Sequence, residues 1–457
     1  MGKRIDLVEG EIVPSLIKLA LPIMGTSFLQ MAYNMTDMFW LGRVGSDAVA
    51  AVGTAGFFMM LSNSLVMICK SGAEIKVAQS IGKGNEKDTK SYIVNSIQVN
   101  MILAFIYGAI IILFNKPLIG FFKLGQENVI YMAETYLVII AMGMIVAFIN
   151  PVFTAIFNGA GNSKTPFMIN TLGLIANIVL DPLFIFGLGP IPSMGVAGAA
   201  IATVLAQAIV TLAFIISIKR SHESFFKFKL LSKMQWSYIK RLSKVGMPVA
   251  LQNGLFTVFA MFIGRIIASW GPVPIAVQKV GSQIEAISWM TAGGFSTALG
   301  TFVGQNYGAK KYDRIFQGYK TTMKMALVVG VLASALLIFQ GEAIFSLFIP
   351  EAEAIVCGKN YLKILGYSQL FMCIEITTAG AFNGLGKTLI PSLISIIFTG
   401  LRVPAAYLLS PESVMGLDGI WWSISMSSVF KGVILTATFL YLMKNKKDKL
   451  YNKELVK

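Results

Sequence analysis

Apolar residues occur along this chain in long blocks separated by short polar connections. Residues 97–114, 137–157 and 198–218, for example, contain no charged side chain. An α-helix needs roughly 20 apolar residues to cross the hydrocarbon core of a bilayer, so blocks of this length predict membrane-spanning helices. Twelve spans fit the sequence, at residues 13–39, 48–71, 92–114, 130–157, 167–187, 194–218, 246–269, 275–303, 319–340, 358–384, 389–410 and 417–443.

The composition agrees with a membrane protein. Of the 457 residues, 55% are hydrophobic and 13% are charged, whereas a soluble domain carries about 25% charged residues. This composition excludes a soluble enzyme. It also excludes a nucleic-acid-binding protein, despite the formal net charge of +16. The expected fold class is an all-α integral membrane protein with twelve transmembrane helices.

The basic residues are distributed unevenly among the connections between the spans. The termini and the even-numbered connections contain 26 Lys and Arg residues, whereas the odd-numbered connections contain three, Arg43, Lys116 and Lys123. Connections rich in Lys and Arg stay in the cytoplasm. We therefore expect a multi-pass protein of a bacterial cell membrane with both termini in the cytoplasm, and the excess charge implies no nucleic-acid partner.

Short motifs recur at a nearly constant distance along the chain. Residues 21–24 match 247–250 at an offset of 226, and Gln79 matches Gln305 at the same offset. Two further pairs have offsets of 225 and 221. They are residues 157–166 with 382–391, and residues 195–198 with 416–419.

Each match falls at the same place within a set of six spans, which predicts two parallel six-helix bundles. This architecture is typical of transporters whose two halves rock around a central site. The expected organisation is an N-terminal bundle at 1–218, a cytoplasmic linker at 219–245, a C-terminal bundle at 246–443 and a basic cytoplasmic tail at 444–457.

The sequence gives no basis for a metal centre or for an enzyme. The single histidine, His222, lies in a polar connection, and Cys69, Cys357 and Cys373 are scattered along the chain. A metal site or a membrane enzyme would need such residues in clusters. We expect no cofactor beyond a coupling ion.

Two acidic residues lie in the outer part of the N-terminal spans. Asp181 is 14 residues into its span, which corresponds to about 21 Å of helix, and Asp37 lies late in the first span. Asn177 shares a helix face with Asp181, Tyr33 and Asn34 share the face of Asp37, and Thr203 is at a similar depth.

A buried carboxylate beside another can hold a proton near neutrality, or both can bind Na⁺. Structural roles are the alternative. Asp37 would then cap the outer end of its helix, and Asp181 would satisfy the backbone group that Pro182 frees.

The C-terminal spans also contain charged residues at mid-depth. Glu285 and Glu375 are acidic, and Arg402 and Lys431 are basic. An unpaired acid would suit a cationic substrate, whereas acids paired with Arg402 or Lys431 would be structural. The sequence leaves this choice open.

Several of these motifs resemble the MATE (multidrug and toxin extrusion) exporters over essentially the whole chain. They are Pro22, the Asp37–Gly45 segment with 48–53, the Gln79 and Gln305 loops, Asn-Gly-x-Gly at Asn158 and Asn383, the segment 177–182, and Trp421-Trp422. The resemblance implies export of organic cations in exchange for H⁺ or Na⁺.

The resemblance also implies roles for individual residues. In the DinF-like branch, acids in the first and fifth spans act with an Asn and a Thr as the ion-coupling group, at positions that read Asp37, Asp181, Asn177 and Thr203 here. The NorM-like branch carries a Glu in the seventh span, and residues 252–256 contain no acid. This departure favours the DinF-like branch and coupling in the N-terminal half, with helix 1 bending near Pro22.

We therefore expect a monomeric, cation-coupled antiporter that exports small organic cations or drugs by alternating access. One alternative is a flippase for lipid-linked sugars, which would need several Arg or Lys at mid-depth. The others are an integral membrane enzyme, which would need a catalytic cluster, and a receptor or channel, which would leave the repeat unexplained.

Overall fold

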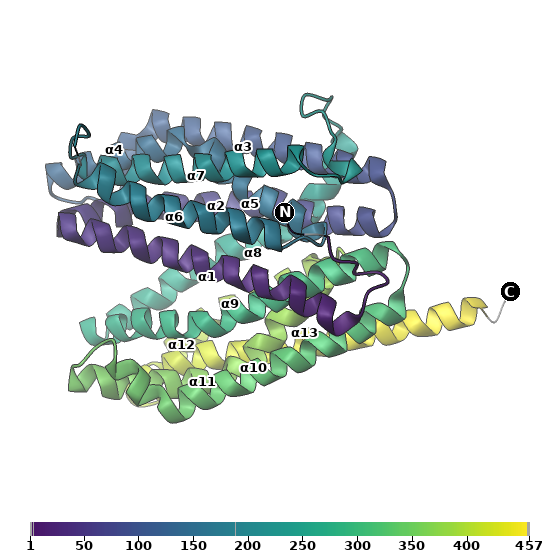
Figure 1. Ribbon diagram of the computed structural model, residues 1–457. Helices are drawn as coiled ribbons and strands as arrows, with labels where there is room; N and C mark the ends of the chain where they lie inside the picture. Colours follow the sequence, from purple (N-terminus) through teal and green to yellow (C-terminus); the bar gives the residue numbers. More distant parts are fainter. Residues whose placement is uncertain (1, 3, 188, 455–457) are drawn as a thin grey trace. The chain divides into compact units, whose positions relative to one another are not determined.

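The computed structural model describes the backbone of residues 2, 4–187 and 189–454 and the side chains up to Lys444. The predicted basic tail at 444–457 lies for the most part outside the described side chains. The described chain is almost entirely helical (Figure 1). Its helices are α1 (Ile12–Val44), α2 (Ser46–Gly82), α3 (Glu86–Gly120), α4 (Glu127–Met142), α5 (Met144–Gly159), α6 (Lys164–Ile185), α7 (Gly195–Lys219), the 3₁₀ turn η1 (Ser224–Phe226), α8 (Trp236–Ala268), α9 (Pro272–Gly308), α10 (Tyr312–Ser346), α11 (Ala352–Gly384), α12 (Leu389–Leu409) and α13 (Leu417–Glu454).

All twelve predicted spans are helices, and the fourth is bent. It consists of α4 and α5, which meet at Gly143 at an angle of 54°. A Cβ at Gly143 would lie 2.5 Å from Cγ2 of Val204 on α7. The glycine therefore permits a close approach of α7 that no regular pattern in the sequence predicts. The matching stretch of α11 is one unbroken helix.

Within the described residues, nine helices are long and apolar enough to cross a membrane, and the bent α4–α5 pair makes ten. Two of the twelve predicted spans, α9 and α11, are not among them. α9 carries Lys279 and Glu285 together with many small and polar residues, and α11 carries several charged side chains. Some of their polar residues, such as Ser288, Gln369 and Glu375, are buried in the second unit, as described below.

The chain forms two compact units. Unit 1 comprises Met1–Ile5 and Leu21–Ala250, and unit 2 comprises Asp6–Ala20 and Leu251–Lys457. Helix α1 begins the first half of the chain and α8 begins the second, and each contains a proline. Both helices thus contribute residues to both units. Pro22 and Pro248 lie within two residues of these divisions. The domain boundaries expected from the sequence stay a prediction.

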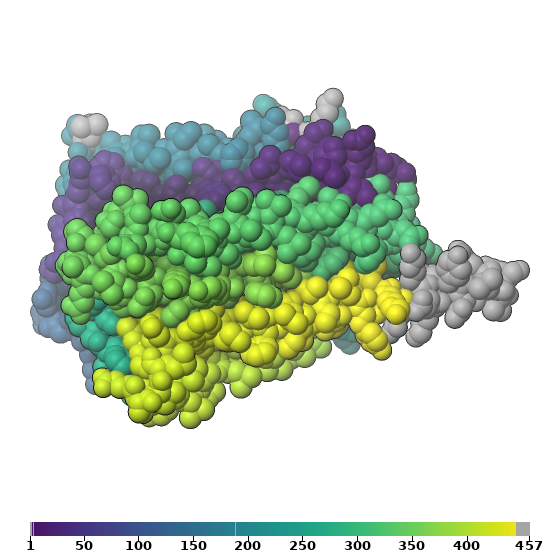
Figure 2. Space-filling model, turned by 90° about the horizontal axis from the view of Figure 1, so that it is seen from below, coloured from purple at the N-terminus to yellow at the C-terminus, as the bar shows by residue number. Residues whose placement is uncertain are grey.

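In unit 1, α2 packs against α3, α4 and α5, and α6 packs against α7 (Figure 1). One apolar core includes Tyr107, Tyr136 and Phe148, and a second includes Phe157 and Phe214. In unit 2, α11 packs against α9, α10 and α13, and α12 packs against α13. Figure 2 shows the yellow surface of α13 adjoining the green surface of α10 and α11.

The repeated motifs make the same backbone contacts in both units. A Cβ at Gly159 would lie 2.6 Å from the carbonyl oxygen of Glu74, and one at Gly384 would lie 2.4 Å from that of Gly300. The two contacts correspond to each other in the repeat, because Gly159 and Gly384 are 225 residues apart and Glu74 and Gly300 are 226 residues apart. Small residues allow two helices to approach this closely. The repeat in sequence is therefore a repeat in packing.

A second pair of matched glycines behaves in the same way. A Cβ at Gly198 would lie 2.2 Å from the carbonyl oxygen of Phe184, and one at Gly419 would lie 2.3 Å from that of Leu409. The turn that follows each Asn-Gly-x-Gly motif is also repeated. The amides of Gly161 and Gly386 donate to the carbonyl oxygens of Asn158 and Asn383, each at 2.8 Å.

Candidate functional site

The centre of the candidate site in unit 1 is a pair of polar residues on α6. Asn177 and Asp181 are one helical turn apart, so their side chains share a face. Nδ2 of Asn177 donates a hydrogen bond of 2.9 Å to Oδ1 of Asp181. Both residues are fully buried in the described structure, although they lie in a span whose neighbours are mostly apolar. A buried carboxylate in such a place is costly unless it is paired or protonated.

Helix α1 brings a second carboxylate to this pair. The side chain of Asp37 interacts with those of Asp181 and Asn177. Two adjacent carboxylates withdrawn from water cannot both carry their charge without a cation or a shared proton. The structure therefore brings together two acids that are 144 residues apart in the sequence.

Three hydroxyl groups surround the two acids. Tyr33, one turn before Asp37 on α1, interacts with Thr203 on α7 and with both carboxylates. Tyr136 on α4 is also buried and interacts electrostatically with Asp37 and Asp181. Sequence reasoning missed Tyr136. Its only signal was a phenol within an apolar span, where the hydroxyl needs a polar neighbour.

Several oxygen atoms of this cluster lack a hydrogen bond of normal geometry within the described structure. They are Tyr33 Oη, Asp37 Oδ1, Asn177 Oδ1, Asp181 Oδ2 and Thr203 Oγ1, and all are buried. Carboxylate, amide and hydroxyl oxygens are the ligands that hard cations prefer. The same oxygens can share a proton. These five oxygen atoms thus suit Na⁺ or H⁺, and none of them is a nitrogen or sulfur ligand. Among the described residues, no group of three His, Cys, Asp or Glu side chains is placed to hold a metal ion.

The other two predicted residues of α1 lie outside this cluster. Asn34 is exposed and accepts a hydrogen bond of 3.5 Å from Gln30. Pro22 lies within a continuous helix, and its carbonyl oxygen accepts a 3.0 Å hydrogen bond from the hydroxyl of Thr26. At Gly25, a Cβ would lie 2.5 Å from the ring of Phe167 on α6. At Gly25, therefore, α1 closely approaches α6 within unit 1.

The charged residues of unit 2 gather in its interior. Nζ of Lys431 on α13 lies 3.0 Å from Oε2 of Glu375 on α11, and both side chains are buried. The pair links α11 and α13, and separating its members would leave an uncompensated buried charge. Of the two possibilities that the sequence left open, pairing applies to Glu375.

Glu285 has a different environment. Its Oε2 accepts a hydrogen bond of 3.0 Å from Gln369 on α11, whose Oε1 accepts one of 2.7 Å from Ser288. The buried Oε1 of Glu285 has no hydrogen-bond partner within the described structure. Tyr361 interacts with the same carboxylate. Among the described side chains, Oε1 of Glu285 thus has no hydrogen bond of normal geometry, although the phenol of Tyr361 lies close to the carboxylate.

Arg402 on α12 is positioned by hydroxyl groups of α13. Its guanidinium donates hydrogen bonds to Ser427 and to Ser428, the latter at 3.2 Å. It interacts electrostatically with both Glu285 and Glu375. The four charged residues predicted in this half thus form one cluster whose formal charges sum to zero. The supporting Gln369, Tyr361, Ser427 and Ser428 were missed, because polar residues are frequent in these helices.

The chain matches the MatE family over residues 22–183 and 248–408, which are the two halves of the predicted repeat. It is 30% identical over 431 residues to a protein of Thermotoga maritima named "Probable multidrug resistance protein NorM", covering 94% of this chain and 92% of that one. A protein of Shewanella oneidensis named "FAD transporter" is 25% identical over 95% of each chain.

The fold is also similar to solved structures. One is described as an outward-facing conformation of a multidrug resistance MATE family transporter of the MOP superfamily. The TM-score is 0.88 at 21% sequence identity, covering 98% of this chain and 99% of that chain. At this identity the likeness concerns the fold.

Proposed function

Because this chain belongs to the MATE family of membrane transporters, we propose that it is a secondary antiporter that exports organic cations, including drugs, in exchange for inward movement of H⁺ or Na⁺. The observation that carries this proposal is the buried oxygen cluster around Asp37 and Asp181. An antiporter needs a site whose occupation by the coupling ion changes the protein's conformation. Two adjacent carboxylates from different helices suit that requirement, because their mutual repulsion depends on the bound cation.

We assign the coupling group to Asp37, Asn177, Asp181 and Thr203, the pattern of the DinF-like branch. Helix α8 supports this assignment, since the helix contains no acidic residue. Tyr33 and Tyr136 complete the group. Their hydroxyls can donate to a carboxylate when the cation leaves, which lowers the cost of the uncompensated charge.

Helix α1 is the element that connects ion binding to transport in this proposal. Residues 12–20 of α1 belong to unit 2 and residues 21–44 to unit 1. Pro22 lies at this division and lacks the amide hydrogen of a regular helix. A proton or Na⁺ that draws Asp37 toward Asp181 bends α1 at Pro22 and changes the relation between the two parts of the helix. The substrate is then released outward.

The proposed substrates are small organic cations. Two relatives whose matches cover 94% and 95% of this chain are named for multidrug resistance and for FAD transport, so the named substrate class differs among such proteins. The charged cluster of unit 2 carries no net positive charge, because Glu285 and Glu375 balance Arg402 and Lys431, and a cationic substrate is compatible with that. A flippase for lipid-linked pyrophosphates would need unpaired basic residues instead. We place both termini in the cytoplasm and regard the protein as a monomer of a bacterial cell membrane.

Transport by the purified protein in proteoliposomes tests this proposal. Uptake of ethidium or norfloxacin is measured under an imposed pH gradient and, separately, under an imposed Na⁺ gradient. We expect one gradient to accelerate drug movement in the opposite direction, and Asp181→Asn to remove the acceleration. If neither gradient changes the rate for the unmodified protein, the antiporter assignment is wrong.

A further inference from the structure

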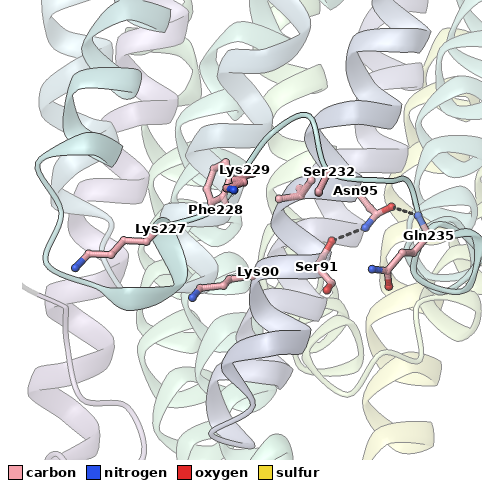
Figure 3. Close-up of a pocket in the computed structure, with 9 residues that line it drawn as sticks. Lys90, Ser91, Asn95, Lys227, Phe228, Lys229, Ser232 and Gln235 are labelled. Atoms are coloured by element: carbon pink, nitrogen blue, oxygen red, sulfur yellow. Dashed lines mark hydrogen bonds between the residues drawn. The ribbon is translucent and has the colours of Figure 1, made fainter.

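Unit 1 contains a basic pocket that the proposed transport cycle does not use. It lies between the first turns of α3 and the connection that follows η1, and it encloses about 210 Å³ (Figure 3). It is lined by Lys90 and Asn95 of α3 and by Lys227, Lys229, Ser232 and Gln235 of the connection. Three lysines from two separate segments thus line one hollow.

Hydrogen bonds from α3 fix the wall of this pocket. Nε2 of Gln98 donates to the carbonyl oxygens of Leu230 and Ser232 at 2.7 and 2.8 Å. Oδ1 of Asn95 accepts a hydrogen bond of 2.8 Å from the backbone amide of Gln235, and Nδ2 of Asn95 donates to Ser91. The connection is therefore held on α3 by side chains at three points, and the lysines extend from a defined backbone.

The charge in the pocket is only partly compensated. Lys90 forms an ion pair with Glu86, one turn earlier on α3. Within the described residues, no ion pair is formed by Lys227 or Lys229. In Figure 3 the amino groups of Lys90 and Lys227 extend to the same side. Ammonium groups gathered in this way attract phosphate, which each lysine binds as a compact point charge.

The pocket lies at the depth of lipid headgroups. Lys90 precedes the apolar run at 97–114 by seven residues, which is about 10 Å of helix. The connection beside the pocket exposes large apolar side chains, with Leu231 99% and Trp236 75% exposed. Tryptophan is enriched where membranes meet water. At this depth, the apolar side chains match the acyl region of a phospholipid and the neighbouring lysines match its phosphate group.

We propose that this pocket binds the phosphate group of an anionic phospholipid, with Leu231 and Trp236 contacting its glycerol and acyl region. The occupant follows from charge complementarity together with the neighbouring exposed apolar side chains, which a free phosphate ion would leave without contacts. The lipid comes from the cytoplasmic leaflet, which is the anionic one, given the orientation proposed above. Its binding attaches the 227–236 connection between the halves of the chain to the membrane.

Calorimetric titration of the purified full-length protein in detergent tests the proposal. The probe is dihexanoyl-phosphatidylglycerol below its micelle concentration, with dihexanoyl-phosphatidylcholine and inorganic phosphate titrated in parallel. We expect binding of phosphatidylglycerol, weakened by Lys90→Gln, Lys227→Gln and Lys229→Gln about fivefold for each lysine, the equivalent of about 1 kcal/mol per cation near an anionic surface. Trp236→Ala should also weaken it.

A matched triple variant, Lys83→Gln, Lys87→Gln and Lys240→Gln, changes the net charge equally at exposed positions outside the pocket and should bind as the unmodified protein does. Equal binding of phosphatidylcholine, or of inorganic phosphate, would overturn the proposal, as would identical losses in the two triple variants. Because the titration uses neither drug nor ion gradient, its outcome is independent of the transport assay.

Discussion

The side-chain amide of Asn177 donates a hydrogen bond of 2.9 Å to Oδ1 of Asp181, while the buried Oδ2 has no hydrogen-bond partner among the described residues. The carboxylate is thus oriented through one of its oxygens, and the other has no hydrogen bond of normal geometry within the described structure. Helix α1 brings the side chain of Asp37 next to that of Asp181. We infer that the two acids act as a unit rather than as two separate helix-end groups, and the expected effects of the substitutions below follow from this proposal.

Asp181→Asn should abolish transport without preventing folding. The amide has the size of the carboxylic acid, but it cannot release a proton or bind Na⁺ with a charge. We expect resistance to norfloxacin in a drug-sensitive bacterial host to fall to that of the empty vector, with the amount of protein in the membrane unchanged. Asp47→Asn, at an exposed position on α2, is the matched control and should keep full resistance. Normal efflux by Asp181→Asn would refute its role in coupling.

Tyr136→Phe should change coupling more than it changes stability. The substitution removes one hydroxyl near Asp37 and Asp181 and leaves the ring in its apolar core. We expect the concentration of coupling ion that gives half-maximal transport to shift severalfold, while the unfolding temperature in detergent stays near that of the parent. Tyr107→Phe is a suitable comparison, because that hydroxyl donates to the backbone of Phe58 instead. An unchanged ion dependence would remove Tyr136 from the coupling group.

Pro22→Ala should slow transport and stabilise α1. Alanine restores a backbone donor and raises helix propensity, by up to about 3 kcal/mol at an interior position. A straighter, stiffer α1 opposes the proposed bend. Drug efflux in proteoliposomes should therefore decrease severalfold, whereas drug binding without a gradient should persist. Pro404→Ala, in α12 of unit 2, provides the comparison. Equal effects of the two substitutions would contradict a special role for Pro22.

Lys431→Met should destabilise the protein, because Glu375 then remains buried without its partner. Removing one member of a buried ion pair costs about 3–5 kcal/mol. In the double variant Glu375→Gln with Lys431→Met no charge is left unpaired, and we expect most of the lost stability to return. Both effects are measured as the fraction of monodisperse protein that remains after heating, which size-exclusion chromatography determines. A double variant as unstable as the single one would show that the pair is not the cause.

Alanine substitutions at Gly159 and Gly384 should destabilise the protein to similar extents. Each new Cβ would meet a backbone carbonyl oxygen, at 2.6 Å and 2.4 Å respectively. Gly53 and Gly56 on α2 have no atom within 4 Å of a Cβ. Alanine there should be neutral or stabilising, by about 1 kcal/mol at most. The same thermal assay should separate the two pairs of variants, and equal behaviour would contradict the packing argument.

Much of the fold was predictable because bilayers impose strong constraints on sequence. Helices that cross a membrane must be apolar over a minimum length, so twelve helical segments were visible as blocks. The repeat was visible because close helix contacts require small residues at the same places in both halves, as at Gly159 and Gly384. The bend at Gly143 was not visible, since it depends on the position of Val204 on another helix.

The sequence by itself determined which charged residues lie at membrane depth, because charges are rare there and Asp37, Asp181, Glu285 and Glu375 are conspicuous among apolar neighbours. Only the tertiary structure decided their partners. It places Asp37 beside Asp181 with Tyr136 nearby, and it pairs Glu375 with Lys431. Glu285 interacts instead with Gln369, Tyr361 and Arg402. Helical periodicity fixes the depth and the face of a residue on its own helix. The neighbour across a helix interface depends on how the helices pack, which no single helix encodes.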